Sequence, residues 1–357
     1  MPGRDIIVVG ASAGGVEALG QLARGLPAGL EAAVFVVLHV SPHGTSVLPQ
    51  ILSRAGPLPA AHAKDGEPIR PGRIYVAPPD FHMLLKDGHV RLARGPTENS
   101  HRPAVDPLFR TAARRYGRRV IGVVLSGVLD DGTAGLQAVK MRGGLAVVQD
   151  PADALYSGMP QNALDNVAVD HVAPVAALGP LLARLAAEPL PDGAAGHVSP
   201  KMEMEADMAE LELDALQTDD RPGKPAGFGC PECGGALWEL QDGELVRYRC
   251  RVGHAWSPDS LLAEQGDALE AALWSALRAL EERAALARTL VARAEKRSHD
   301  AIAAKFRLQI KEAEAHARVI RNVLLNKGGE NTDSTSPATG VKAAVGTNGP
   351  GHAPAGG

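Results

Sequence analysis

Residues 6–15, Ile-Ile-Val-Val-Gly-Ala-Ser-Ala-Gly-Gly, decide the fold of this chain. An apolar run ends in a glycine turn, and a helical pattern follows to about residue 24, which predicts a strand, a turn and a helix. Gly10-x-Ser12-x-Gly14 matches the nucleophile elbow, whose glycines permit a sharp turn that exposes the serine hydroxyl. A glycine turn that binds phosphate or a dinucleotide has the same pattern. The motif alone leaves both interpretations open.

Strand and helix patterns alternate through the first 190 residues. Asp87-Gly88 lies between two apolar segments and predicts a hairpin with a primed turn. The other strands are expected at 5–9, 34–38, 73–77, 120–125 and 145–148. Helices are expected at 15–24, at 107–116 with Asp106 as the cap, from 133, and at 174–187, either continuous or divided at Gly179-Pro180. This alternation predicts an α/β fold with a mostly parallel, doubly wound sheet and helices on both faces.

Two further stretches favour a serine nucleophile. His39 ends the second predicted strand, and Asp130-Asp131-Gly132 follows the strand at 120–125. Because functional groups gather at the carboxyl ends of parallel strands, Ser12, His39 and one aspartate are expected at one edge of the sheet. An imidazole base held by a carboxylate is what a serine nucleophile needs. A structural histidine and helix-capping aspartates are the alternatives, whereas a nucleotide site would favour an acidic residue in place of His39.

Five stretches resemble, in the same order and at similar separations, the catalytic domain of CheB-type chemotaxis protein-glutamate methylesterases. They are Ile6–Gly15, Leu38–His43, His101–Phe109, Leu125–Gly135 and Gly158–Pro160. The resemblance implies a catalytic triad of Ser12, His39 and Asp131, the aspartate directly before glycine, and no cofactor for catalysis. It implies hydrolysis of glutamate methyl esters in methylated chemotaxis receptors, and deamidation of glutamine through the same acyl-enzyme. Hydrolysis of another carboxylic ester and a non-catalytic signalling scaffold are the alternative functions.

The chain departs from that family in two respects. Members in chemotaxis usually carry an N-terminal receiver domain, whereas this chain starts at the esterase strand, so we expect activity that needs no phosphorylation. Ala13 stands where many members have threonine. Neither difference touches the three triad positions.

All three cysteines lie in one short segment. Cys230-x-x-Cys233 and Cys250-x-x-x-His254 have the spacing of a zinc ribbon, with three thiolates and one imidazole for a structural zinc ion. A segment of this size has too small a core to fold unaided. Four ligands leave no open position on the metal, so we expect no catalytic role for it. The alternative is a reduced miniature fold with unligated thiols.

The composition completes the domain plan. The 357 residues carry a net charge of -4, which gives no reason to expect a nucleic-acid partner, and the chain lacks a long apolar stretch, so we expect a cytoplasmic protein that is not inserted in a membrane.

Leu273, Leu280 and Leu290 belong to an approximate heptad seam, which predicts a helical hairpin, a coiled-coil contact with another chain or signalling partner, or a single helix on the esterase. The linker is expected to decouple the module from the esterase, so that chelation would spare turnover. The expected parts are a catalytic domain at 1–188, an acidic Pro/Gly-rich linker at 189–227, the zinc-ribbon-like module at 228–258, a helical segment at 259–326 and a disordered tail at 327–357.

Overall fold

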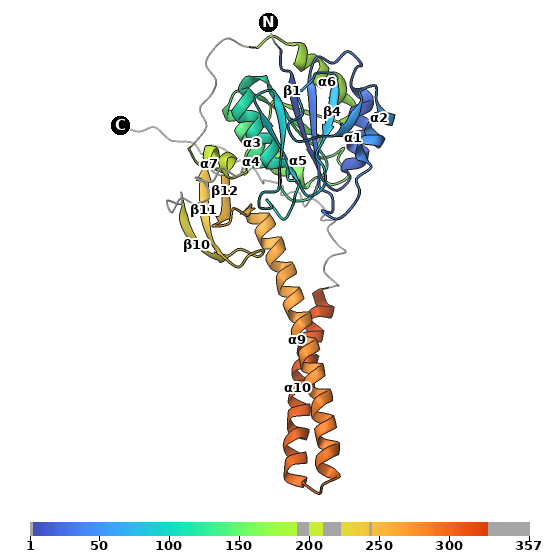
Figure 1. Cartoon of the computed structure of the whole chain (residues 1–357), viewed down its shortest axis with the longest axis vertical. Helices are drawn as coiled ribbons and strands as arrows, with labels where there is room; N and C mark the ends of the chain where they lie inside the picture. The colour runs from blue at the N-terminus through green and yellow to red at the C-terminus, as the bar shows by residue number, and fades with distance from the viewer. Residues whose placement is uncertain (1–2, 191–199, 210–222, 243–244, 328–357) are drawn as a thin grey trace, which may run out of the picture. The chain divides into compact units, whose positions relative to one another are not determined.

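The computed structural model describes residues 3–190, 200–209, 223–242 and 245–327. The chain divides into two compact units, Met1–Gly266 and Asp267–Gly357 (Figure 1). Most of the predicted linker and all but the first residue of the predicted tail lie outside the described residues. Among the described residues, no helix combines the length and apolar character needed to cross a bilayer.

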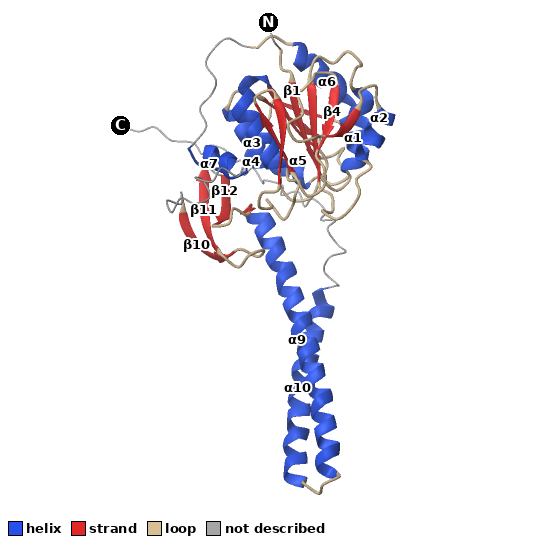
Figure 2. Ribbon diagram, viewed as in Figure 1, coloured by secondary structure: helices blue, strands red, loops and turns tan. Residues whose placement is uncertain are grey.

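A seven-stranded parallel sheet forms the centre of the first unit (Figure 2). Its strand order is β3-β4-β2-β1-β7-β8-β9, and every neighbouring pair is parallel. The strands are β1 (Ile6–Ala11), β2 (Ala33–Leu38), β3 (Ala60–His62), β4 (Arg73–Val76), β7 (Val120–Val124), β8 (Leu145–Gln149) and β9 (His171–Ala173). The central strands are buried on both faces, which explains why they read as continuous apolar runs.

Helices cover both faces of the sheet, as the alternating pattern predicts (Figure 2). One face packs against α1 (Gly15–Gly25), α2 (Leu48–Ala55) and α6 (Val175–Ala187). The other packs against α3 (Val105–Tyr116), α4 (Thr133–Met141), α5 (Gly158–Asn166) and the predicted hairpin β5 (His82–Lys86)–β6 (His89–Ala93). A 3-10 turn, η1 (Gly117–Arg119), joins α3 to β7. Side chains alternate along β1, with Val8 in one cluster and Val9 in the other.

Of the two alternatives at Gly179-Pro180, the structure has the continuous helix, and α6 runs through Pro180. A Cβ built on Gly179 would lie 2.4 Å from the carbonyl carbon of Gly25. Glycine therefore allows α6 to approach the end of α1, so this dipeptide marks a close helix contact rather than a break.

A small antiparallel sheet follows in the same unit. It has the order β10-β11-β12-β13, with strands β10 (Lys224–Gly229), β11 (Ala236–Asp242), β12 (Leu245–Cys250) and β13 (Ala255–Trp256). Its buried core consists of five residues, namely Cys230, Leu237, Cys250, Trp256 and Leu261. We call residues 224–257 the Cys3His module.

The expected decoupling of this module is wrong. Helix α7 (Pro200–Ala209) lies within the predicted linker, and its buried Glu205 pairs with Arg247 at 2.7 Å and with Arg249 at 3.2 Å. Arg249 also pairs with Glu98, in the loop between β6 and α3, at 3.1 Å. Buried charges that satisfy one another across this boundary fix the module against the parallel-sheet part.

The second unit is a helical hairpin, one of the three arrangements that the seam allows. Its helices are α9 (Pro258–Glu295), which begins in the first unit, and α10 (Asp300–Lys327). Arg288 pairs with Glu314, and Arg321 pairs with Glu281, so the two helices run antiparallel. Contact with another chain through this hairpin stays a prediction.

Candidate active site and metal centre

Ser12 and His39 follow neighbouring parallel strands. In the pairing of β1 with β2, Ala11 lies opposite Leu38. Ser12 and His39, which follow these two strand ends, are therefore neighbours. His39 Nδ1 is 3.1 Å from Ser12 Oγ. The structure thus brings these two side chains together at the carboxyl edge of the sheet, where the sequence places them.

The turn after β1 presents Ser12. Gly14 caps α1 with a φ of 71°, a conformation that favours glycine, and a Cβ on Gly10 would lie 2.3 Å from a methyl of Val105. The hydroxyl of Ser126 donates a 2.8 Å hydrogen bond to the carbonyl of Ala13 and holds the turn from the side of β7. Helix α1 starts at Gly15, three residues after Ser12, and the first N–H groups of a helix are the kind of donor that stabilises a tetrahedral oxyanion.

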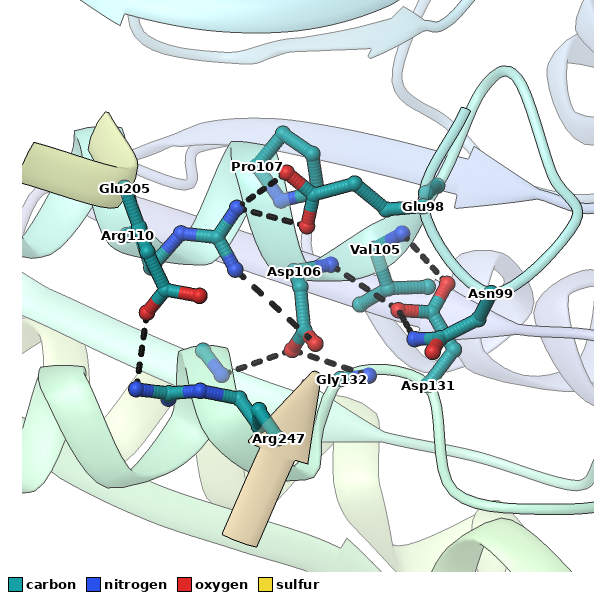
Figure 3. Close-up of polar contacts among 12 residues, drawn as sticks. Glu98, Asn99, Val105, Asp106, Pro107, Arg110, Asp131, Gly132, Glu205 and Arg247 are labelled. Carbon is teal, nitrogen blue, oxygen red and sulfur yellow. Dashed lines mark hydrogen bonds and ion pairs between the residues drawn. The ribbon is translucent and has the colours of Figure 1, made fainter. Parts of the chain in front are cut away.

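Asp131 lies in the loop between β7 and α4 and is 3% exposed. Its Oδ2 accepts a 2.7 Å hydrogen bond from His39 Nε2. The same oxygen accepts a 2.7 Å hydrogen bond from the N–H of Val105 (Figure 3). Its Oδ1 accepts hydrogen bonds from the N–H of Asp106 and from Asn99 Nδ2, both at 3.2 Å. The carboxylate therefore binds the first amides of α3 while facing the imidazole.

The two aspartates near this site exchange caps between helices. Asp106 was expected to cap its own helix, but α3 starts at Val105 with Ala104 as its N-cap. The Asp106 carboxylate instead accepts hydrogen bonds from the N–H groups of Gly132 at 3.1 Å and Gly135 at 2.6 Å, at the start of α4 (Figure 3). Asp131, just before α4, accepts hydrogen bonds from the first N–H groups of α3. Each helix thus provides the carboxylate that caps the other, and these bonds fix the position of Asp131.

The electrostatics keep Asp131 ionised beside the imidazole. Burial opposes ionisation of Asp131, but the hydrogen bond and charge of His39 outweigh it and hold the pKa of this carboxyl well below its ordinary value. An ionised carboxylate only accepts, so the bond to Asp131 requires a proton on His39 Nε2, and Nδ1 faces Ser12. Burial, chiefly, raises the pKa of neighbouring Asp130 to about 6. Below about pH 6 the two aspartates therefore differ in charge state, with Asp131 ionised and Asp130 mostly protonated.

The site opens into a groove of about 380 Å³. Ser12 and His39 line it together with His101 and Arg102, and Arg102 donates a 2.9 Å hydrogen bond to Asp80. The ring of His101 stacks on that of His39 with centroids 3.7 Å apart, and burial followed by the His39 charge lowers the pKa of His101 to about 4. Sequence reasoning assigned no role to Asn99 or His101, although both lie in or beside one of the five quoted stretches.

The four predicted metal ligands converge at the module. Their ligand atoms all lie within 4.8 Å of one another, and Cys233 Sγ is 3.7 Å from Cys250 Sγ. His254 Nδ1 is 3.7 Å from Cys230 Sγ and 3.4 Å from Cys250 Sγ. Tetrahedral zinc, with Zn–S about 2.3 Å and Zn–N about 2.0–2.1 Å, places its ligand atoms roughly 3.5–3.8 Å apart. These distances fit such an ion.

The turns and surroundings of this cluster are also those of a metal centre. The N–H of Gly234 donates to the carbonyl of Cys230 at 2.8 Å, and that of Gly253 donates to Cys250 at 3.1 Å, so each ligand pair sits on a tight turn. His254 Nε2 is 3.5 Å from a carboxylate oxygen of Glu232. A carboxylate behind a ligating histidine fixes its orientation.

An α/β sheet with serine, imidazole and buried carboxylate at its carboxyl edge has the arrangement of the serine hydrolase class. The CheB methylesterase family model matches residues 7–182. A putative protein-glutamate methylesterase/protein-glutamine glutaminase of Leptospira interrogans is 36% identical over 182 residues, which cover 51% of this chain and 94% of that protein. The chain belongs to the CheB methylesterase family.

Other relatives are longer. Protein-glutamate methylesterase/protein-glutamine glutaminase 2 of Anaeromyxobacter dehalogenans is 41% identical over 171 residues, which cover 48% of this chain and 50% of that protein. The match thus spans only about half the length of several curated relatives. The crystal structure of the Thermotoga maritima CheB methylesterase catalytic domain is 35% identical, with a TM-score of 0.49, and the match covers 51% of this chain and 98% of that one.

Proposed function

We propose that this chain is a serine hydrolase that removes methyl esters from glutamate side chains of methylated chemotaxis receptors and deamidates glutamine at such sites. The observation that carries the proposal is the continuous hydrogen-bonded series from Ser12 Oγ through His39 to Asp131, 3.1 Å and 2.7 Å long at its two links. Membership of the CheB methylesterase family supports the substrate class.

In the proposed mechanism, His39 Nδ1 takes the proton of Ser12 as Oγ attacks the γ-carbonyl of the glutamyl ester. The tetrahedral intermediate collapses, and methanol leaves with the proton returned by His39. Water then gives a proton to His39 as it attacks the glutamyl-enzyme ester, and His39 passes this proton to Ser12 Oγ as the ester bond breaks and glutamate leaves. Asp131 holds the ring and stabilises its protonated form. With glutamine as substrate, ammonia leaves in place of methanol.

The test measures methanol release from a receptor protein methylated on glutamate. We expect turnover by the full chain, and Ser12→Ala should lower it by about 10⁴- to 10⁶-fold, since triad members act as a unit. Ser53→Ala, which removes an exposed hydroxyl bonded to Ala60, is the matched control and should behave as wild type. Retained turnover in Ser12→Ala contradicts the triad. Hydrolysis of simple esters without release from the receptor favours another carboxylic ester as substrate.

We also propose that Cys230, Cys233, Cys250 and His254 hold one structural zinc ion. The spacing of their ligand atoms supports this. When bound, the ion cross-links the two turns of the module. Four protein ligands saturate it, so the ester chemistry remains with the serine site.

A further inference from the structure

Residues 97–101 connect the Cys3His module to the proposed triad. The carbonyl of Thr97 accepts a hydrogen bond from the N–H of Ala255 at 3.3 Å, and the N–H of Asn99 donates to the carbonyl of Ala255 at 2.8 Å. Ser100 Oγ donates to Glu264 at 2.6 Å. The same segment carries His101, which stacks on His39, so the module holds a loop that touches two members of the site.

Asn99 is the residue through which the contact reaches Asp131 (Figure 3). Its Oδ1 accepts hydrogen bonds from the N–H of Ser257 at 2.9 Å and from Ser260 Oγ at 2.8 Å. Its Nδ2 donates to Asp131 Oδ1 at 3.2 Å. A single carboxamide thus joins the first turn of α9 to the carboxylate that orients His39.

The donors of α9 determine which way this amide points. A backbone N–H cannot accept, so Ser257 must face the carbonyl oxygen of Asn99. The NH₂ group then faces Asp131, where it provides one of the two donors to Oδ1. This bond leaves Oδ2 directed at His39. With the amide reversed, its carbonyl oxygen would meet an ionised carboxylate.

The buried charges at the same boundary keep these donors in place. Glu98 accepts two hydrogen bonds from Arg110 of α3, both at 2.6 Å, and a third from Arg249 of β12 at 3.1 Å (the Arg110 pair is drawn in Figure 3). Burial opposes ionisation of Glu98, yet Arg110 and Arg249 lower its pKa to about 2. Ser257 Oγ also donates to Asp130 at 2.6 Å. Displacing the module would therefore leave buried charges unpaired.

We propose that Asn99 is a positioning residue for the triad and that the Cys3His module, with the first turn of α9, sets its orientation. The inference rests on the proposed function. Esterase turnover should thus depend on a module that lies far from it in sequence, and the ion held there should affect turnover without touching the substrate.

The decisive variant is Asn99→Asp, tested in the full chain by methanol release from methylated receptor between pH 5 and 9. Aspartate tolerates the φ of 51° at this position. It replaces a donor to Asp131 by a negative charge, so kcat/KM should fall about 10- to 100-fold, the range for a hydrogen bond to a charged group. The added charge favours protonated His39, so the acid limb of the pH profile should move to higher pH. A purely structural defect would lower activity without that shift.

The second variant, Ser260→Ala, acts from outside the esterase sequence. It removes one donor to the Asn99 oxygen and should lower kcat/KM about fivefold, as the loss of a neutral hydrogen bond does. The controls are Asn166→Asp on the exposed face of α5 and Ser275→Ala on the exposed face of α9, and both should match wild type.

The outcomes separate the two proposals. If the wild-type chain releases no methanol, or Ser12→Ala equals wild type, the proposed function fails. If wild type is active, Ser12→Ala is inactive, and Asn99→Asp keeps its rate and pH profile, only the positioning role is overturned. If Asn99→Asp does not fold, Ser260→Ala decides, and an unchanged kcat/KM in that variant rejects the role of the module.

Discussion

The esterase part and the Cys3His module hold their polar groups in opposite ways. The esterase sheet lies between two extensive buried apolar clusters, and its polar groups lie in the turns and loops at its carboxyl edge. The buried apolar cluster at the module has five members, namely four module residues and Leu261 of α9, and two of the five are ligand cysteines. In the first region the fold positions the chemistry, whereas in the second the ligand atoms hold the fold together. One polar cluster therefore depends on the surrounding fold for its geometry, whereas in the other the surrounding fold depends on the polar cluster.

Among the predicted effects, the largest is expected from metal removal, which should unfold the module and leave the esterase sheet folded. Structural zinc contributes about 10–16 kcal/mol in small domains, so a chelator should unfold the module while the parallel sheet stays folded. Trp256, which is 2% exposed, should then show a red-shifted fluorescence, and restoring zinc should reverse it. Elemental analysis should find one zinc per chain. Less than one equivalent of metal, or loss of the parallel sheet together with the module, would break the comparison.

The two adjacent aspartates test how the esterase positions its chemistry. Asp131→Asn should lower turnover by about 10⁴-fold, because an amide no longer accepts from Nε2–H and the imidazole is left in the wrong tautomer. Asp130→Asn is the matched control. Its oxygen can still accept from Ser257, so methanol release should stay within a few-fold of wild type. A larger loss in the Asp130 variant than in the Asp131 variant would move the triad by one residue.

Asp130 also gives the smallest effect, on stability. Its folded pKa of about 6 lies above the ordinary value of 3.8, so its contribution to stability is complete below pH 4 and is lost as the pH rises through 6. Asp130→Asn escapes this loss and should be more stable than wild type by about 1–3 kcal/mol at pH 8, with little difference at pH 4. Urea unfolding at the two pH values measures this. A stability difference that does not change with pH would show that burial does not raise the pKa of Asp130.

The sequence predicted the elements whose pattern is local. β1, the turn at Ser12 and His39 at the end of β2 could be derived because strand ends of a parallel sheet meet at one edge. The choice of Asp131 over Asp130 needed a family resemblance, since both follow β7 and both are plausible caps. The short elements α2, β3, α5 and β9 were missed, because each is too short to show a clear period.

The contact of the module with the esterase could not be predicted. Asn99 and Ser257 are 158 residues apart, and neither has a composition or period that points to the other. Glu98, Arg249 and Glu205 likewise look like ordinary surface charges until the fold buries them. The acidic, Pro/Gly-rich linker predicted that the module is independent of the esterase, but independence depends on which groups the two parts bury against each other.

Because α3 and α4 exchange caps, hydrogen exchange of backbone amides can report on the site. The amide hydrogens of Val105 and Asp106 are bonded to Asp131, and those of Gly132 and Gly135 are bonded to Asp106. Each amide hydrogen exchanges with solvent deuterium only when its hydrogen bond to the carboxylate breaks. Four slow amides at two helix starts would therefore record how tightly the carboxylate behind His39 is held, in a protein that is performing no chemistry at all.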